Sequence, residues 1–374
     1  SNGTPTGPTV TISGLTIANG RAAAGAFPTS SGGGIQSDRA NVTVRACVFT
    51  GNASDPSGFT YGGGIFNNEG TLVVEQSTFT NNDAYYGAGI CIYDATGGSG
   101  AVGTIRNSTF AANDATYGGA VYNQAINNGS SADMSVTNST LSGNAATNAG
   151  GAIYNSGALS GSAYTSLTDC TVNANSAPNG GGIYNFSNSA NATVFLRNNI
   201  LRTIASGGNV FNNGGTVTSS GNNLTNDNTG FASNSGDIRN TDPMLGPLAF
   251  NGGLTQTHAL LSGSLAINAG TSFFAPTQDQ RGFFYVGAND IGAYELNGIE
   301  LRITSITRLA NGDIQLQGSG SPNGAHTILA ALLPGPRTSY ASIGTATANA
   351  SGVWQFTDTA ADGFTKRFYE ASFP

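Results

Sequence analysis

Three tyrosines and two aspartates recur at matched positions, and they are the residues best placed to act together chemically. Tyr61, Tyr86 and Tyr117 each stand immediately before a glycine phrase. Asp83 and Asp114 each follow the asparagine of a second repeated phrase. Two aligned carboxylates could share a Ca²⁺ ion, and an aromatic stripe beside them could hold a sugar chain. The structural alternative is a solvated loop face with stacked side chains, and no basic residue is expected in register with these five.

The elements that would position these residues follow from a repeat. The glycine phrase recurs as GGGIQSD, GGGIFNN, GAGICIY, GGAVYNQ, GGAIYNS and GGGIYNF, and the second phrase as CVFTGN, STFTNN, STFAAN, STLSGN and CTVNAN. The apolar residues that they repeat form one column of Ile35, Ile65, Ile90, Val121, Ile153, Ile183 and Val210. Two further columns contain Phe49, Phe79, Phe110, Leu141, Val172 and Leu201, and Val44, Val74, Ile105, Val136, Leu167 and Leu196.

The apolar residues stand in short alternating runs such as TLVVEQSTF, a pattern typical of strands. A repeat of about 30 residues with short strands and Gly/Asn corners fits one coil of a solenoid. The sequence therefore predicts an all-β fold, a right-handed parallel β-helix. A β-sandwich or a propeller is the alternative, but propeller blades are longer, at ~40–45 residues.

Asparagines occupy two further columns, and we interpret them as structural ladders at the coil corners. One column contains Asn52, Asn82, Asn113, Asn144 and Asn175, and the other contains Asn67, Asn123, Asn155, Asn185 and Asn212. Asparagine tolerates left-handed backbone geometry, and stacked asparagines bond one another along a ladder. Repetition in nearly every coil argues against catalysis, because an active site is needed once.

The low content of charged residues and the lack of long apolar runs argue against binding to nucleic acid and against a membrane span. Charged residues make up 9% of the 374 residues, the net charge is −7, and Lys366 is the single lysine. This balance provides no basic footprint for nucleic acid. No apolar run approaches the ~20 residues of a membrane span. Cys47 and Cys170 share a column but lie four coils apart, and Cys91 lies in a different column, so three free, mostly buried thiols are expected.

No catalytic residue and no metal site can be assigned from the sequence. The two histidines, His258 and His326, have no Cys or His at metal-ligand spacing. We interpret His258 as a structural residue. Near the expected end of the solenoid, Arg281 is predicted to form a structural salt bridge with one of the acids Asp279, Asp290 and Glu295.

The glycine and F-x-x-N phrases resemble the repeats of polymorphic outer-membrane proteins. The block from 242 to 295, DPMLGPLAFNGGLTQTHALLSGSLAINAG…DQRG…DIGAYE, is similar to the end of the choice-of-anchor Q type family of secreted bacterial right-handed parallel β-helix proteins. This resemblance covers about residues 9–296. It implies a secreted or surface-displayed bacterial protein, from a family without an established enzymatic role. The N-terminal extension and C-terminal anchor usual in such proteins are not obvious here.

The composition shifts after residue 296 to runs such as IELRITSITR, DIQLQGSG and GVWQFTD. The expected domains are a β-helix over residues 1–296 and an Ig-like or fibronectin-III-like β-sandwich over residues 297–374. The sandwich resembles the C-terminal modules of secreted bacterial proteins, which implies a role in adhesion or assembly.

Two functions remain open. The first is a non-enzymatic structural protein outside the cell or on its surface, either a filament subunit or an adhesin stalk. Because the strand at TVTISGLTIANG follows the coil pattern after about eight residues, its open edge is expected to join copies head to tail. The second is a polysaccharide-binding protein, or a lyase or glycoside hydrolase, acting along a solenoid face. No cofactor is expected, apart from a Ca²⁺ ion that the two aligned aspartates could share.

Overall fold

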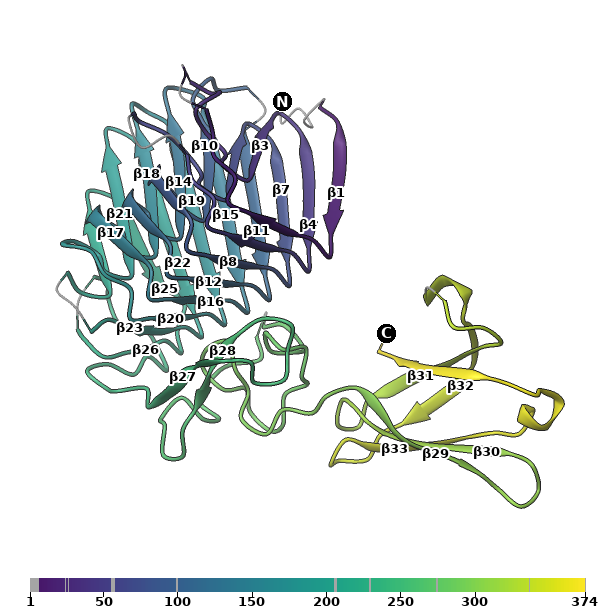
Figure 1. The fold of residues 1–374 in the computed structure, drawn as a ribbon. Coiled ribbons are helices and arrows are strands. Elements are labelled where there is room, and N and C mark those ends of the chain that lie inside the picture. The colour runs from purple at the N-terminus through teal and green to yellow at the C-terminus, as the bar shows by residue number, and fades with distance from the viewer. Residues whose placement is uncertain are drawn as a thin grey trace. The chain divides into compact units, whose positions relative to one another are not determined.

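The computed structural model describes residues 7–373, apart from 24, 26, 55–57, 99, 205–206, 229, 274 and 336. The described chain is built from β-strands, with two short 3-10 turns at Arg337–Ser339 and Ala361–Gly363. It divides into two compact units, Ser1–Pro276 with Ala288–Tyr294, and Thr277–Gly287 with Glu295–Pro374. Figure 1 shows the strands of the first unit side by side in successive coils.

The first unit is a parallel β-solenoid, in which each full coil passes through sheets D, A and B. Sheet A contains β1 (Thr9–Ser13), β4 (Asn41–Arg45), β7 (Thr71–Glu75), β11 (Ala101–Arg106), β15 (Ser131–Thr137), β19 (Ser162–Thr168), β22 (Asn191–Arg197) and β25 (Thr216–Ser219). Sheet B contains β2 (Thr16–Ala18), β5 (Val48–Thr50), β8 (Thr78–Thr80), β12 (Thr109–Ala111), β16 (Thr140–Ser142), β20 (Thr171–Asn173), β23 (Ile200–Arg202) and β26 (Leu224–Thr225).

The other two sheets of the solenoid differ in length. Sheet D contains β3 (Ile35–Asp38), β6 (Ile65–Asn68), β10 (Ile90–Asp94), β14 (Val121–Ile126), β18 (Ile153–Ala158), β21 (Ile183–Asn188) and β24 (Val210–Asn213). Sheet C is shorter and contains β9 (Asp83–Tyr86), β13 (Asp114–Tyr117) and β17 (Ala145–Ala149). The prediction of an all-β solenoid is confirmed.

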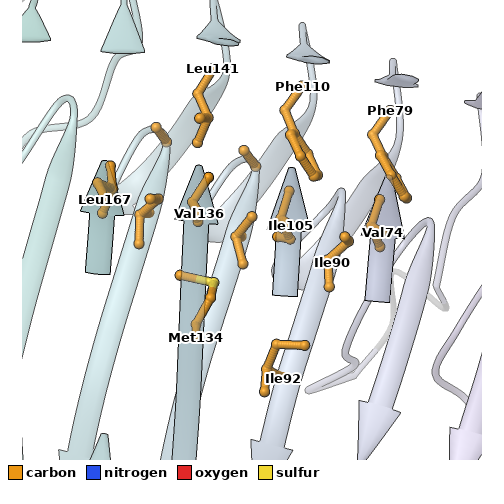
Figure 2. Packing of buried hydrophobic residues seen from close by; sticks show 14 of the residues in the cluster. Val74, Phe79, Ile90, Ile92, Ile105, Phe110, Met134, Val136, Leu141 and Leu167 are labelled. Atoms are coloured by element: carbon orange, nitrogen blue, oxygen red, sulfur yellow. The ribbon is translucent and has the colours of Figure 1, made fainter. Parts of the chain in front are cut away.

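The core is built from the predicted apolar columns, which face one another inside the coils. Phe49, Phe79 and Phe110 stack with ring centroids 4.6 and 4.7 Å apart and nearly parallel planes. Figure 2 shows Phe79 and Phe110 on neighbouring strands, with Val74 and Ile105 close beside them. All five side chains are at most 1% exposed. Burying each such side chain contributes roughly 1.5–3 kcal/mol, so the repeated columns are the main source of stability.

The glycine phrases are required by close contact between coils. Gly62 has a φ of 65°, in the left-handed region that favours glycine. A Cβ on Gly63 would lie 2.4 Å from the Asp83 carbonyl oxygen and 2.6 Å from that of Ala88. The three cysteines are free and buried, as predicted. Burial raises the pKa of the Cys170 thiol to about 12.

The block that follows the last coil covers the outer face of sheet B. Its hairpin, β27 (Leu245–Ala249) and β28 (Thr257–Leu260), carries His258, whose Nε2 lies 2.9 Å from the Ser142 hydroxyl and 3.1 Å from the Asn173 amide. Its Nδ1 lies 2.8 Å from the carbonyl oxygen of Gly246 and must donate there. Burial lowers the pKa of His258. These contacts give the neutral imidazole a structural role.

The second unit contains two three-stranded antiparallel sheets. One contains β29 (Arg302–Arg308), β30 (Ile314–Ser319) and β33 (Val353–Asp358), and the other β32 (Ala341–Thr347), β31 (Ala325–Ala331) and β34 (Phe368–Ser372). Trp354 is 1% exposed, and its Nε1 donates to the carbonyl oxygen of Ser319. Arg281 pairs with Asp279 at 2.7 Å, but both belong to this unit rather than to the last coil. The second unit contains Glu295–Pro374 together with the earlier segment Thr277–Gly287, so the predicted boundary after residue 296 lies just inside this unit.

Candidate functional site

The predicted stripe lies on the outside of the solenoid, along sheet C. Asp83 and Asp114 are register partners at the first positions of β9 and β13. Tyr117 pairs with Tyr86, and Tyr86 forms a bridge with Tyr61. The structure therefore brings together all five residues in the arrangement expected from the repeat.

One expectation about this stripe is wrong, because a basic residue does lie in register. Arg21 forms a β-bridge with Ala53, which forms one with Asp83, so Arg21 belongs to the same column. Burial and the neighbouring Asp114 raise the pKa of Asp83, while the charge of Arg21 lowers it. Arg21 was missed because it stands in NGRAAAG, outside both repeated phrases. The column is a mixed-charge edge rather than a purely acidic site.

The tyrosines pack against a second aromatic column from sheet D. We call this set the aromatic ladder; it consists of Tyr61, Phe66, Tyr86, Tyr117, Tyr122, Tyr154 and Tyr184. Three of its members follow directly after the inward-facing residue of their strands: Phe66, Tyr122 and Tyr154. Because side chains alternate along a strand, these three point outward and would be expected to be exposed. They are nevertheless between 0 and 8% exposed. The sheet C tyrosines thus belong to a second, external hydrophobic cluster.

The rings of the ladder stack face to face along the solenoid. Tyr61 and Tyr86 have centroids 4.9 Å apart and an interplanar angle of 18°, and Tyr86 and Tyr117 lie 5.4 Å apart at the same angle. Tyr122, Tyr154 and Tyr184 continue with separations of 5.0 and 4.9 Å. A sugar ring binds an aromatic side chain through the ring face, and here the faces meet one another. This geometry favours stabilisation of the coil stack.

The chemistry of the stripe also differs from that of a calcium site. Burial, together with Tyr85 and Tyr117, raises the pKa of Tyr86 to about 12, so this phenol remains protonated at neutral pH. Calcium takes six to eight oxygen ligands with several carboxylates among them. In the part of the chain that the structure describes, no three His, Cys, Asp or Glu side chains gather as metal ligands.

The corner asparagines form a continuous buried ladder, as the columns predicted. The Asn82 amide nitrogen donates to the Asn113 Oδ1 at 2.9 Å and to the Phe49 carbonyl oxygen at 3.1 Å. Its backbone N–H also donates to the Asn113 Oδ1, and the same pattern repeats at Asn113 and Asn144. Each side chain therefore satisfies groups from the coils on both sides, which accounts for buried amides in the interior.

The asparagine column of sheet D is interrupted by one apolar residue. Ile92 is the register partner of both Asn67 and Asn123. From Asn123 onward the amides bond in series, with Asn123 donating to the Asn155 Oδ1 at 2.9 Å. The Asn123 Oδ1 is buried and has no hydrogen-bond partner among the described residues, because Ile92 offers no donor. Gly103 leaves the space that Ile92 fills, since a Cβ there would lie 2.9 Å from the Ile92 side chain.

Buried acids beside sheet D were also missed, because they stand outside the repeated phrases. The Glu69 side chain is 2% exposed and pairs with Arg39 at 2.9 Å. Asp94 is fully buried and accepts backbone N–H groups from Thr96 and Ser131 at 3.0 and 2.9 Å. Partners of this kind fix turns between strands, so these acids are structural.

Comparison of the chain with protein-family models found no match, and comparison with curated proteins found none either. No helix among the described residues is long and apolar enough to cross a membrane.

Proposed function

We propose that this chain is a non-enzymatic structural protein, a subunit of an extracellular filament or an adhesin stalk. Copies join head to tail through the first coil of the solenoid. The resemblance to secreted bacterial β-helix proteins supports a location on the cell surface or outside the cell. The β-sandwich is the module we assign to assembly or adhesion.

The observation that carries this proposal is the partly exposed rung at the N-terminal side of the solenoid. Among the described residues, β1, β2 and β3 are end strands of sheets A, B and D. Their inward residues Ile12, Ile17 and Ile35 are half-buried, whereas the partners of Ile17 and Ile35 on the next coil, Phe49 and Ile65, are fully buried. An end strand with partly exposed apolar side chains is a template for another chain.

Sedimentation velocity across a concentration series tests this proposal. Wild-type protein is expected to form elongated multimers whose size grows with concentration. Ile17→Lys places a charge on the open rung and should give monomers, while the matched control Thr104→Lys, on the outer face of sheet A in mid-solenoid, should still assemble. Thermal unfolding of each variant separates loss of assembly from loss of folding. Wild-type monomers at every concentration, or equal assembly by both variants, would overturn the proposal.

A further inference from the structure

The outer face of sheet A contains a second group of aromatic residues, away from the aromatic ladder. Two of its outward columns contain Thr9, Asn41, Thr71, Val102, Asp133, Tyr164, Thr193 and Thr216, and Thr11, Thr43, Val73, Thr104, Ser135, Ser166, Phe195 and Thr218. Tyr164 and Phe195 are the aromatic residues among these mostly small side chains. They lie on adjacent strands, β19 and β22, which Figure 1 shows side by side.

These two rings border a hollow of about 280 Å³. Ser166 and Thr168 of β19 line it together with Ser220. Small-molecule sites usually enclose roughly 300–1,000 Å³, so the size suits one ring of a longer chain lying along the sheet. The hollow therefore combines aromatic walls with hydroxyl groups, the two features that bind a sugar ring.

The aromatic rings of the hollow are arranged differently from those of the ladder. Tyr164 is 38% exposed, and its centroid lies 5.3 Å from that of Phe195 with the planes tilted by 39°. The ladder ring Tyr122 is only 3% exposed, so the exposed part of Tyr164 is what distinguishes the hollow. A pyranose can therefore contact the Tyr164 side chain.

The charge around the hollow indicates which kind of sugar it would take. Arg197 is the charged residue among those that line it. Its guanidinium lies 5.8 Å from the centre of the Phe273 ring, and its Nη1 donates to the carbonyl oxygen of Phe273 at 3.1 Å, so the side chain is held in place. Asp133 is the register partner of Tyr164 on the opposite side from β22. A carboxylate on the ligand would thus be attracted toward Arg197 and repelled from Asp133.

We infer that this hollow binds one residue of an acidic polysaccharide, a uronic acid whose carboxylate pairs with Arg197 and whose ring packs on Tyr164. The site is independent of head-to-tail assembly. It would give a surface filament or stalk a specific contact with a carboxylated glycan.

Titration calorimetry tests this inference. The acidic probes are tetrasaccharides of galacturonic, glucuronic and mannuronic acid, and the neutral probes are the corresponding tetrasaccharides of galactose, glucose and mannose. Binding of at least one acidic tetramer in preference to its neutral counterpart is expected. Tyr164→Ala should abolish binding. Arg197→Gln should weaken acidic binding about tenfold or more while leaving neutral binding unchanged, since it removes the charged partner of the ligand carboxylate. Arg197→Lys should retain part of the acidic preference.

Two matched controls keep the test specific. Arg106→Gln removes an arginine from the same outward position of sheet A, and Tyr117→Ala removes a tyrosine from the ladder. Both should bind as the wild type does. The inference is overturned if no acidic tetramer binds, if neutral tetramers bind equally well, or if Arg106→Gln weakens binding as much as Arg197→Gln.

Discussion

The aromatic ladder and the hollow on sheet A use the same residue types in opposite ways. In the ladder, tyrosines recur in register and their ring faces meet, so that Tyr122 is 3% exposed although it points away from the core. In the hollow, Tyr164 follows Asp133 and precedes Thr193 in its column and remains 38% exposed. In these two regions the repeated tyrosines are therefore buried by one another, whereas Tyr164, which is not repeated in its column, keeps part of its ring exposed.

The largest expected effect separates these two regions directly. Tyr122→Ala removes a buried ring and leaves a cavity, which should lower the free energy of unfolding by about 3–5 kcal/mol. Tyr164→Ala removes an exposed ring and should change it by less than about 0.5 kcal/mol. Urea unfolding followed by circular dichroism measures both. Similar losses of unfolding free energy in the two variants would show that the Tyr164 ring contributes to stability as much as the buried Tyr122 ring does.

The next effect extends the comparison to the interrupted asparagine column. Ile105→Asn should be strongly destabilising, because it buries an amide without partners at a cost of about 2–7 kcal/mol. Ile92→Asn should cost at least about 2 kcal/mol less, because its amide would donate to the buried Asn123 Oδ1. The same unfolding experiment compares the variants. Equal losses would mean that position 92 does not belong to the ladder.

A smaller effect is expected at Asp169, which interrupts a turn column of Asn107, Asn138 and Asn198. Burial raises its pKa to about 7, although Asn198 donates to its Oδ1 at 3.0 Å. The folded state therefore holds a proton that the unfolded chain releases near pH 4, so stability is full below that pH and falls as pH rises toward 7.

Asp169→Asn should remove this dependence. We expect the variant to gain roughly 1–2 kcal/mol over the wild type between pH 5 and pH 7. Thermal unfolding in matched buffers measures it. A constant difference between the two proteins across this range would contradict a buried, protonated carboxyl.

The smallest effect is expected at the outer rim of the aromatic ladder. Tyr117 is half-buried and accepts a hydrogen bond from the Asn148 side chain at 2.7 Å. Tyr117→Ala should lower stability by only about 1 kcal/mol, since the Tyr154 ring that it meets edge-on retains its stacked neighbours Tyr122 and Tyr184. Differential scanning fluorimetry is sensitive enough. A loss as large as that of Tyr122→Ala would place Tyr117 in the interior of the cluster.

The sequence predicted the features that depend on repetition. The columns through Phe79 and Asn113 could be aligned from their phrases, and the structure has the same register. The burial of Tyr122 could not be predicted, because alternation along a strand places it outside and only the packing of sheet C covers it. Ile92 fits the apolar pattern of its strand, so its type alone does not show that it replaces an asparagine of the ladder. The pairing of Ile92 with Asn123 shows this, because the Asn123 Oδ1 has no donor there.

The hollow was not predictable for a related reason. Tyr164, Phe195 and Arg197 differ from their counterparts on neighbouring coils, so no repeated phrase connects them. They form a group only through the pairing of β19 with β22. Arg21 escaped detection because it joins the Asp83 column through isolated bridges.

Electron microscopy of negatively stained wild-type protein tests the central claim most directly. A subunit of a filament or stalk should form chains of particles joined end to end, with one repeating distance along the chain. Ile17→Lys should convert these chains to single particles. Fields that contain only separate particles of wild-type protein, at concentrations where association is expected, would contradict the account.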